Sequence, residues 1–176
     1  MAVGEICICG FVTEKPKVIF SLSEWVEEIK GWVRDCKEKE PEGQLPAVMV
    51  LLCEDGEKIR LVHLFLNWGD EEEKEKMAEV VTSLASSLSG LMAAVFCSEV
   101  WYVEEKEDKA LRVRPSLHPE RKEGVLVVVW QKGKVQVHLA EIQENDDGMK
   151  GIGEWQVSEQ NEEIGLWRPL WVLLNK

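Results

Sequence analysis

Residues 112–124, RVRPSLHPERKEG, bring together side chains that are well suited to chemistry. The segment holds guanidinium, hydroxyl and imidazole groups, and its candidate ligand-binding residues are Arg112, Arg114, Ser116, His118 and Arg121. An arginine presents a planar fork of N–H donors that fits a phosphate group. One hypothesis is therefore that the protein sequesters a nucleotide at this segment.

The same segment permits a second chemistry, which is hydrolysis by an activated hydroxyl. His118 could act as the base if Glu99 oriented its ring and Ser116 supplied the nucleophile. The chain contains no Gly-x-Ser-x-Gly turn to present such a serine. Pro115 and Pro119 stiffen the segment whether or not it is a site. The favoured interpretation is a rigid connection, with a ligand or partner contact second and catalysis third.

Metal and cofactor chemistry find little support in the sequence. The chain has three histidines and five scattered cysteines, and Cys7-Ile8-Cys9 lacks the spacing of a zinc knuckle. The glycine-rich residues 148–153, GMKGIG, follow acidic residues and lack the Lys-Ser/Thr ending of a phosphate-binding loop. We therefore predict no metal site and no cofactor.

Charge and tryptophan content indicate a protein that binds other proteins. Lys plus Arg number 21 against 33 Asp plus Glu, so the net charge is -12, which disfavours nucleic acid and anionic membranes. Trp155, Trp167 and Trp171 near the C-terminus could form a surface for a partner or for self-association, but a lid over the core is the favoured interpretation. Scattered reduced cysteines and short apolar runs predict a cytoplasmic location without membrane insertion.

Periodicity predicts the elements that position these residues. Ser21 followed by Glu24 is a capping box, and apolar residues at helical spacing predict a helix over residues 21–38. Trp25 and Trp32 lie seven residues apart on the apolar stripe of this helix. They could line a groove for a coenzyme or a partner, but packing in the core is the favoured interpretation.

The whole chain, residues 1–176, is predicted to form one domain. The Asp55-Gly56 pair predicts a hairpin, because a type I′ turn needs positive φ at both central residues. The expected elements are edge strands within 1–20, a helix over 21–38, the hairpin over 47–66, a helix over 70–89, strands within 91–142 and a closing tail over 154–174.

This element order, α-β-β-α-β-β-β, predicts an α+β fold. We expect a single antiparallel sheet of about five or six strands, with the two main helices packed mainly on one face. The order resembles that of the Roadblock/longin and profilin-like modules, and the resemblance is one of element order alone.

A second resemblance rests on residues. The segments FLNWGDEEEKEKMAEVV, AAVFCSEVWYV and RPSLHPERKEGVLVV resemble a set of uncharacterised phage and prophage proteins. In that set, a strand ending in a Ser-Glu-aromatic step is followed by a Pro-Ser-x-His-Pro-x-Arg-x-Glu loop. The matching positions here are Ser98, Glu99, Trp101, Pro115, Ser116, His118, Pro119, Arg121 and Glu123. The resemblance covers about residues 46–140 and implies a viral or mobile-element origin, with host cytosol as the location.

These observations favour a non-enzymatic protein that binds a partner protein or a small ligand, with host or defence modulation as its role. The alternatives are the nucleotide-sequestering protein, the hydrolase using His118 with Glu99, and a structural virion component.

Overall fold

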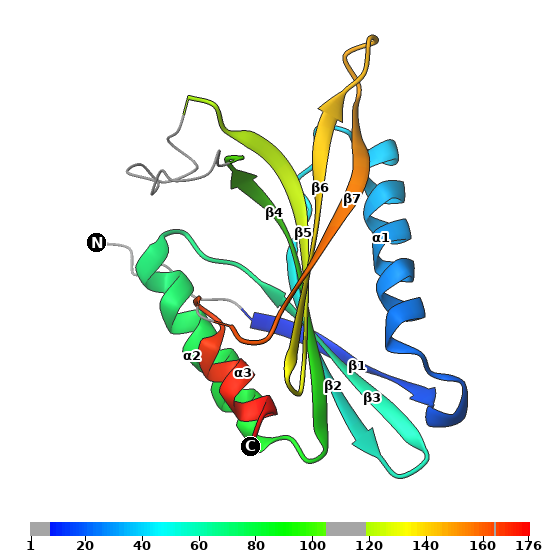
Figure 1. Cartoon of the computed structure of the whole chain (residues 1–176), viewed down its shortest axis with the longest axis vertical. Coiled ribbons are helices and arrows are strands. Elements are labelled where there is room, and N and C mark those ends of the chain that lie inside the picture. Colours follow the sequence, from blue (N-terminus) through cyan, green and yellow to red (C-terminus); the bar gives the residue numbers. More distant parts are fainter. Residues whose placement is uncertain (1–7, 105–118, 164) are drawn as a thin grey trace.

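The computed structural model describes residues 8–104, 119–163 and 165–176 (Figure 1). These residues form one sheet of seven strands in the order β1-β3-β2-β4-β5-β6-β7, and every neighbouring pair is antiparallel. The strands are β1 (Ile8–Pro16), β2 (Ala47–Asp55), β3 (Lys58–Leu66), β4 (Leu91–Tyr102), β5 (Lys122–Gln131), β6 (Lys134–Glu144) and β7 (Lys150–Gln160). The helical elements are the 3-10 turn η1 (Lys17–Ile19), α1 (Leu22–Lys39), α2 (Glu71–Ser87) and α3 (Arg168–Leu174). The predicted class, α+β with a single antiparallel sheet, is confirmed.

The sequence predicted that the helices pack mainly on one face of the sheet, and the structure differs from this prediction. Helix α1 covers one face of the sheet, whereas α2 and α3 pack together on the other (Figure 1). Two separate hydrophobic clusters result, because successive side chains of a strand point to opposite faces. In β2, for example, Leu51 belongs to the α2–α3 cluster and Leu52 to the α1 cluster. The central strands are therefore buried on both faces.

Capping residues define the starts of the two long helices. The side chain of Ser21 accepts a hydrogen bond from the backbone N–H of Glu24. Asp70 caps α2 in the same way by accepting from the N–H of Glu73 at 2.9 Å. Each oxygen satisfies one of the backbone donors that the first turn of a helix leaves without a partner.

Tight turns join consecutive strands at glycines with positive φ. The predicted hairpin is present, but its two loop residues are Gly56 and Glu57, since Asp55 pairs with Lys58. Lys132 and Gly133 form the corresponding loop between β5 and β6.

Two segments differ from the sequence prediction. Residues 154–174, expected to be one closing element, contain the end of edge strand β7 and then α3. The glycine-rich residues 148–153 form the end of a short turn after β6 and the start of β7. Among residues 1–20, the described part forms one edge strand, β1, followed by η1.

Candidate functional site

The segment that drew attention in the sequence lies mostly outside the described residues. Arg112, Arg114, Ser116 and His118 fall in the range 105–118, so the predicted ligand-binding set and the His118–Glu99 pair remain predictions. Arg121 is described, and its guanidinium lies 4.7 Å from the ring centroid of Trp101. This distance is that of a cation–π contact.

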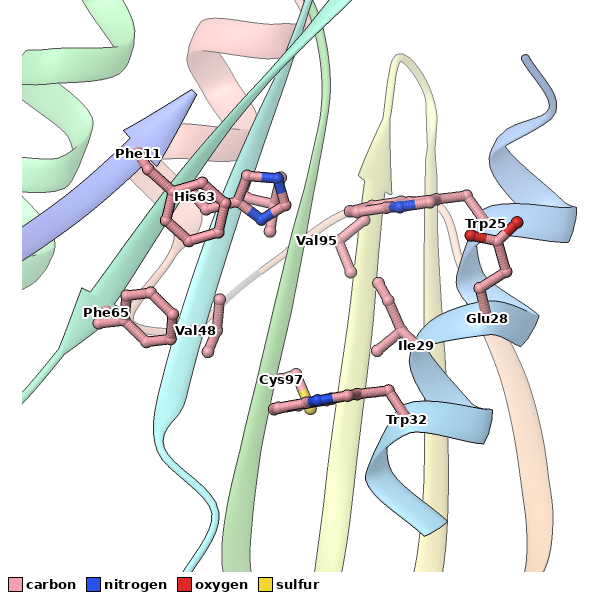
Figure 2. A pocket seen from close by; sticks show the side chains of 11 residues that line it. Phe11, Trp25, Glu28, Ile29, Trp32, Val48, His63, Phe65, Val95 and Cys97 are labelled. Carbon is pink, nitrogen blue, oxygen red and sulfur yellow. The ribbon is translucent and has the colours of Figure 1, made fainter. Parts of the chain in front are cut away.

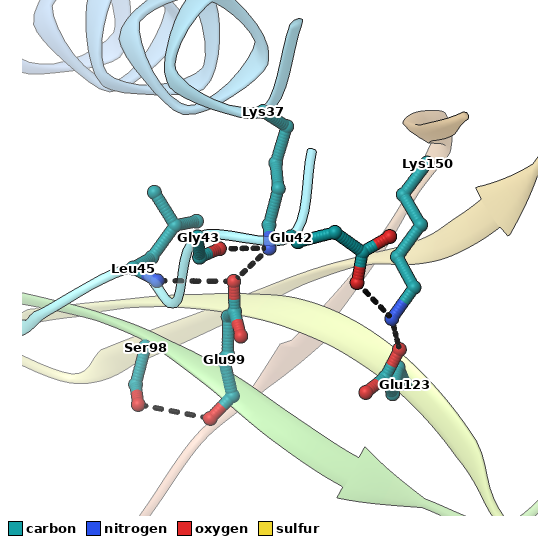
Figure 3. Close-up of polar contacts among 8 residues, drawn as sticks. All are labelled: Lys37, Glu42, Gly43, Leu45, Ser98, Glu99, Glu123 and Lys150. Atoms are coloured by element: carbon teal, nitrogen blue, oxygen red, sulfur yellow. Dashed lines mark hydrogen bonds and ion pairs between the residues drawn. The ribbon is translucent and has the colours of Figure 1, made fainter. Parts of the chain in front are cut away.

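Glu99, the other predicted catalytic residue, belongs to a buried polar junction (Figure 3). Its carboxylate forms an ion pair with Lys37 of α1 and accepts a hydrogen bond from the N–H of Leu45 at 3.0 Å. Lys37 also donates to the carbonyl of Gly43 at 2.6 Å. Glu99 therefore ties β4 to the end of α1 and to the loop that follows it.

Glu123, the acid that ends the phage-like motif, is also engaged. Its carboxylate lies 3.0 Å from Nζ of Lys150, and Glu42 lies 3.9 Å from the same nitrogen (Figure 3). The hydrogen bond to Glu123 and its negative charge raise the pKa of Lys150 above its usual value. This second junction joins the start of β5 to the start of β7.

The three C-terminal tryptophans do not form one surface. Trp167 is buried in the α2–α3 cluster, with its ring centroid 5.5 Å from Phe96, and Trp171 packs partly buried against the same cluster. Trp155 packs against the α1 cluster on the opposite face, where Nζ of Lys30 lies 5.3 Å from its ring centroid. The three tryptophans therefore pack on opposite faces of the sheet.

Two histidines occupy partly or fully buried positions on the α1 face. Nε2 of His63 lies 2.9 Å from Oγ1 of Thr13, whereas the ring nitrogens of buried His138 have no hydrogen-bond partner within the described chain. Burial lowers the pKa of both imidazoles, and Lys30 adds to the effect at His138. Among the described residues, no three His, Cys, Asp or Glu side chains are grouped so that they could hold a metal ion.

The strongest candidate site is an apolar cleft between α1 and the strands β1, β3, β2 and β4 (Figure 2). The cleft has a volume of about 350 Å³. Its lining comes from both sides: Trp25, Glu28, Ile29 and Trp32 from α1, and Phe11, Val48, Val50, His63, Phe65, Val95 and Cys97 from the sheet.

Figure 2 shows how the helix contributes two aromatic walls. Trp25 and Trp32 extend from α1 toward the sheet, with Ile29 between them. Seven residues of helix rise by about 10 Å, so the two indoles are spaced by about two turns along the helix. Trp25 is buried, whereas Trp32 is 43% exposed.

The opposite wall is a set of rings on neighbouring strands. Phe11 of β1 stacks on His63 of β3, with ring centroids 4.5 Å apart and an interplanar angle of 10°. Phe65, two residues farther along β3, lies 5.9 Å from Phe11. Phe11 is 50% exposed, so the cleft opens to solvent beside the edge strand.

The chemistry of this cleft suits binding. Burial raises the pKa of the Cys97 thiol to about 12, so this sulfur is protonated and poorly nucleophilic at neutral pH. His63 is engaged by Thr13, and Glu28 at the rim forms an exposed ion pair with Lys15 at 3.4 Å. An apolar surface with a few polar groups at its margin recognises shape and apolar area.

The sequence pointed to only one part of this cleft. Trp25 and Trp32 were considered as groove residues, but core packing was favoured for both; that holds for Trp25 and is wrong for half-exposed Trp32. The residues of the opposite wall gave no signal, because Phe11, His63 and Phe65 meet through strand pairing alone.

Comparison with known protein families, with curated proteins and with solved structures finds no match for this chain. No helix within the described ranges is long and apolar enough to cross a membrane.

Proposed function

We propose that this chain is a non-enzymatic binding protein whose cleft between α1 and the sheet holds an apolar anchor of a partner protein. The observation that carries the proposal is the half-exposed aromatic lining, to which Trp32 contributes from α1 and Phe11 from β1. Tryptophan is enriched among the residues that dominate binding energy at interfaces.

The openness of the cleft favours a protein partner over a small molecule. Pockets for small molecules enclose most of the ligand surface. This cleft instead leaves Trp32 and Phe11 about half exposed at its mouth, and its volume of about 350 Å³ suits one or two apolar side chains. A protein can fill it while the rest of its surface covers the rim.

The negative charge of this chain predicts which residues surround the apolar anchor on the partner protein. The chain carries a net charge of -12, and Glu28 stands at the rim with two thirds of its side chain exposed. Opposite charges across an interface accelerate association and exclude wrong partners. We therefore expect basic residues beside the apolar anchor of the partner.

The hydrolase hypothesis receives less support, because Glu99 is already engaged by Lys37 and by the N–H of Leu45.

The resemblance to phage and prophage proteins extends the proposal to its biological setting. There, a binding protein of this kind would modulate a host protein.

A peptide selection tests the cleft directly. Random displayed peptides are selected on the wild-type chain, and dissociation constants of the enriched peptides are measured by calorimetry. We expect sequences with an aromatic or aliphatic anchor flanked by Lys or Arg. Trp32→Ala should weaken their binding by about tenfold or more, since a central tryptophan contributes upward of 1.4 kcal/mol.

Trp101→Ala provides a matched control. Trp101 has the same exposed fraction as Trp32, 43%, but it does not line the cleft. Peptides that bind the Trp32→Ala protein as tightly as the wild type would overturn the proposal. A small molecule that copurifies with the wild type and is lost on Trp32→Ala would instead show that the cleft is a small-molecule site.

A further inference from the structure

We infer that two copies of this chain associate edge to edge through strand β1, which joins their sheets into one. Strand β1 pairs with β3 on one side, and no strand in the described part of the chain pairs with its other side. An unpaired edge of this length offers a row of backbone donors and acceptors to a further strand.

The pairing with β3 fixes which residues of β1 face outward. Beyond the end of β1, the N–H of Lys17 donates to the carbonyl of Glu57 at 2.8 Å. Hydrogen-bonded pairs alternate along an antiparallel ladder, so the odd-numbered residues of β1 bond to β3. The N–H and C=O groups of Gly10, Val12 and Glu14 therefore point to the free edge. Pro16, which has no N–H, falls on the same outward set, where proline is tolerated.

Strand β1 can pair with β1 of a second copy in an antiparallel register. A two-fold axis at Val12 places Val12 opposite Val12 of the second copy and Gly10 opposite Glu14. The three outward-facing residues then all exchange backbone hydrogen bonds with the second copy.

Side chains support this register. Val12 is 55% exposed, and the two-fold contact would cover it with an identical valine. The register sets Glu14 against Gly10 and Lys15 against Cys9, so no two like charges face each other directly. An axis at Glu14 would instead oppose two carboxylates, which is unfavourable.

The axis residue of this contact lies outside the proposed cleft, whereas Phe11 at the mouth of the cleft would face Thr13 of the second copy. Val12 pairs with Val62, whose side chain lies in the α2–α3 cluster, so Val12 lies on the sheet face opposite the cleft. Phe11, its neighbour, points to the cleft face. A substitution at Val12 can therefore abolish association and leave the cleft intact.

A charge exchange at Val12, followed by sedimentation velocity over a range of micromolar concentrations, tests the inference. We expect the wild type to dimerise, and Val12→Lys and Val12→Glu each to be monomeric because like charges meet at the axis. An equimolar mixture of the two variants should recover the dimer, because Lys then faces Glu. Val157→Lys is the matched control, since Val157 is 53% exposed on the other edge strand, β7.

Each outcome decides the matter. A wild type that stays monomeric throughout, a Val12→Lys variant that dimerises like the wild type, or a mixture that stays monomeric would overturn the inference. Loss of the dimer on Val157→Lys would place the contact on β7. Circular dichroism shows whether the variants are folded.

Discussion

Replacing Lys37 by Met should destabilise the fold more strongly than any exposed ion pair could. The Lys37 side chain is 4% exposed and that of Glu99 is 19% exposed, so the substitution leaves a largely buried carboxylate without its cation. Removing one partner of a buried pair costs about 3–5 kcal/mol. Because water reaches part of Glu99, we expect about 3 kcal/mol, or a fall in melting temperature of about 6–12 °C.

Chemical denaturation with guanidinium measures this change, and two further variants make it decisive. Glu99→Leu added to Lys37→Met removes the unpaired carboxylate, so the double variant should be less destabilised than the sum of the single effects by about 1–3 kcal/mol. Lys122→Met breaks the solvent-accessible pairs with Glu104 and Glu141 and should cost less than about 1 kcal/mol. Additive single effects, or a Lys37→Met cost no larger than that of Lys122→Met, would refute the reasoning.

Three further predictions concern pH, a turn and a helix start. The pKa of His138 is lowered in the native state. The unfolded chain therefore binds a proton near pH 6.5 that the native state does not bind. The free energy of unfolding should consequently fall as the pH drops from about 7.5 to 5.5. His138→Leu should flatten that fall in denaturation midpoints across this range, and an unchanged slope would contradict it. Gly90→Ala should lower the melting temperature clearly more than Gly133→Ala does. Both glycines have φ near +70°. A Cβ at Gly90 would lie 2.2 Å from the carbonyl oxygen of Glu54, whereas a Cβ at Gly133 would have no atom within 4 Å. Asp70→Ala should cost about 1 kcal/mol by denaturant titration, since it removes the cap of α2, and a neutral result would show that the cap is dispensable.

Local signals in the sequence located most of the elements. The capping side chains of Ser21 and Asp70 and the glycine turn after β2 have short-range causes, so sequence alone predicted two helices and a hairpin. Strand β7 was missed because KGIGEWQVSEQ is rich in glycine and polar residues, as an exposed edge strand permits. The placement of helices on both faces had a signal that was not used. The runs AVMVLLC and VLVVVW are continuously apolar, which is typical of strands covered on both sides.

The candidate site was harder to predict than the fold. Whether Trp32 is exposed depends on where α1 crosses the sheet, and no local pattern encodes this. The contact of Phe11 with His63 joins residues about fifty positions apart through the register of β1 and β3. Glu99 drew attention for its place in a motif, whereas its actual partner, Lys37, looked like an ordinary residue at the end of a helix.

Burial of the central strands on both faces has a consequence for how this chain finds its fold. In a sheet with one wet face, a slip of one residue turns apolar side chains outward and is strongly penalised. In β2, the same slip would only exchange Leu51 with Leu52 between two apolar layers. The hydrophobic pattern therefore specifies the register of these strands only weakly. The register depends instead on the turns at Gly56 and Gly133. Substitutions at Gly56 should therefore produce misaligned chains that aggregate during folding.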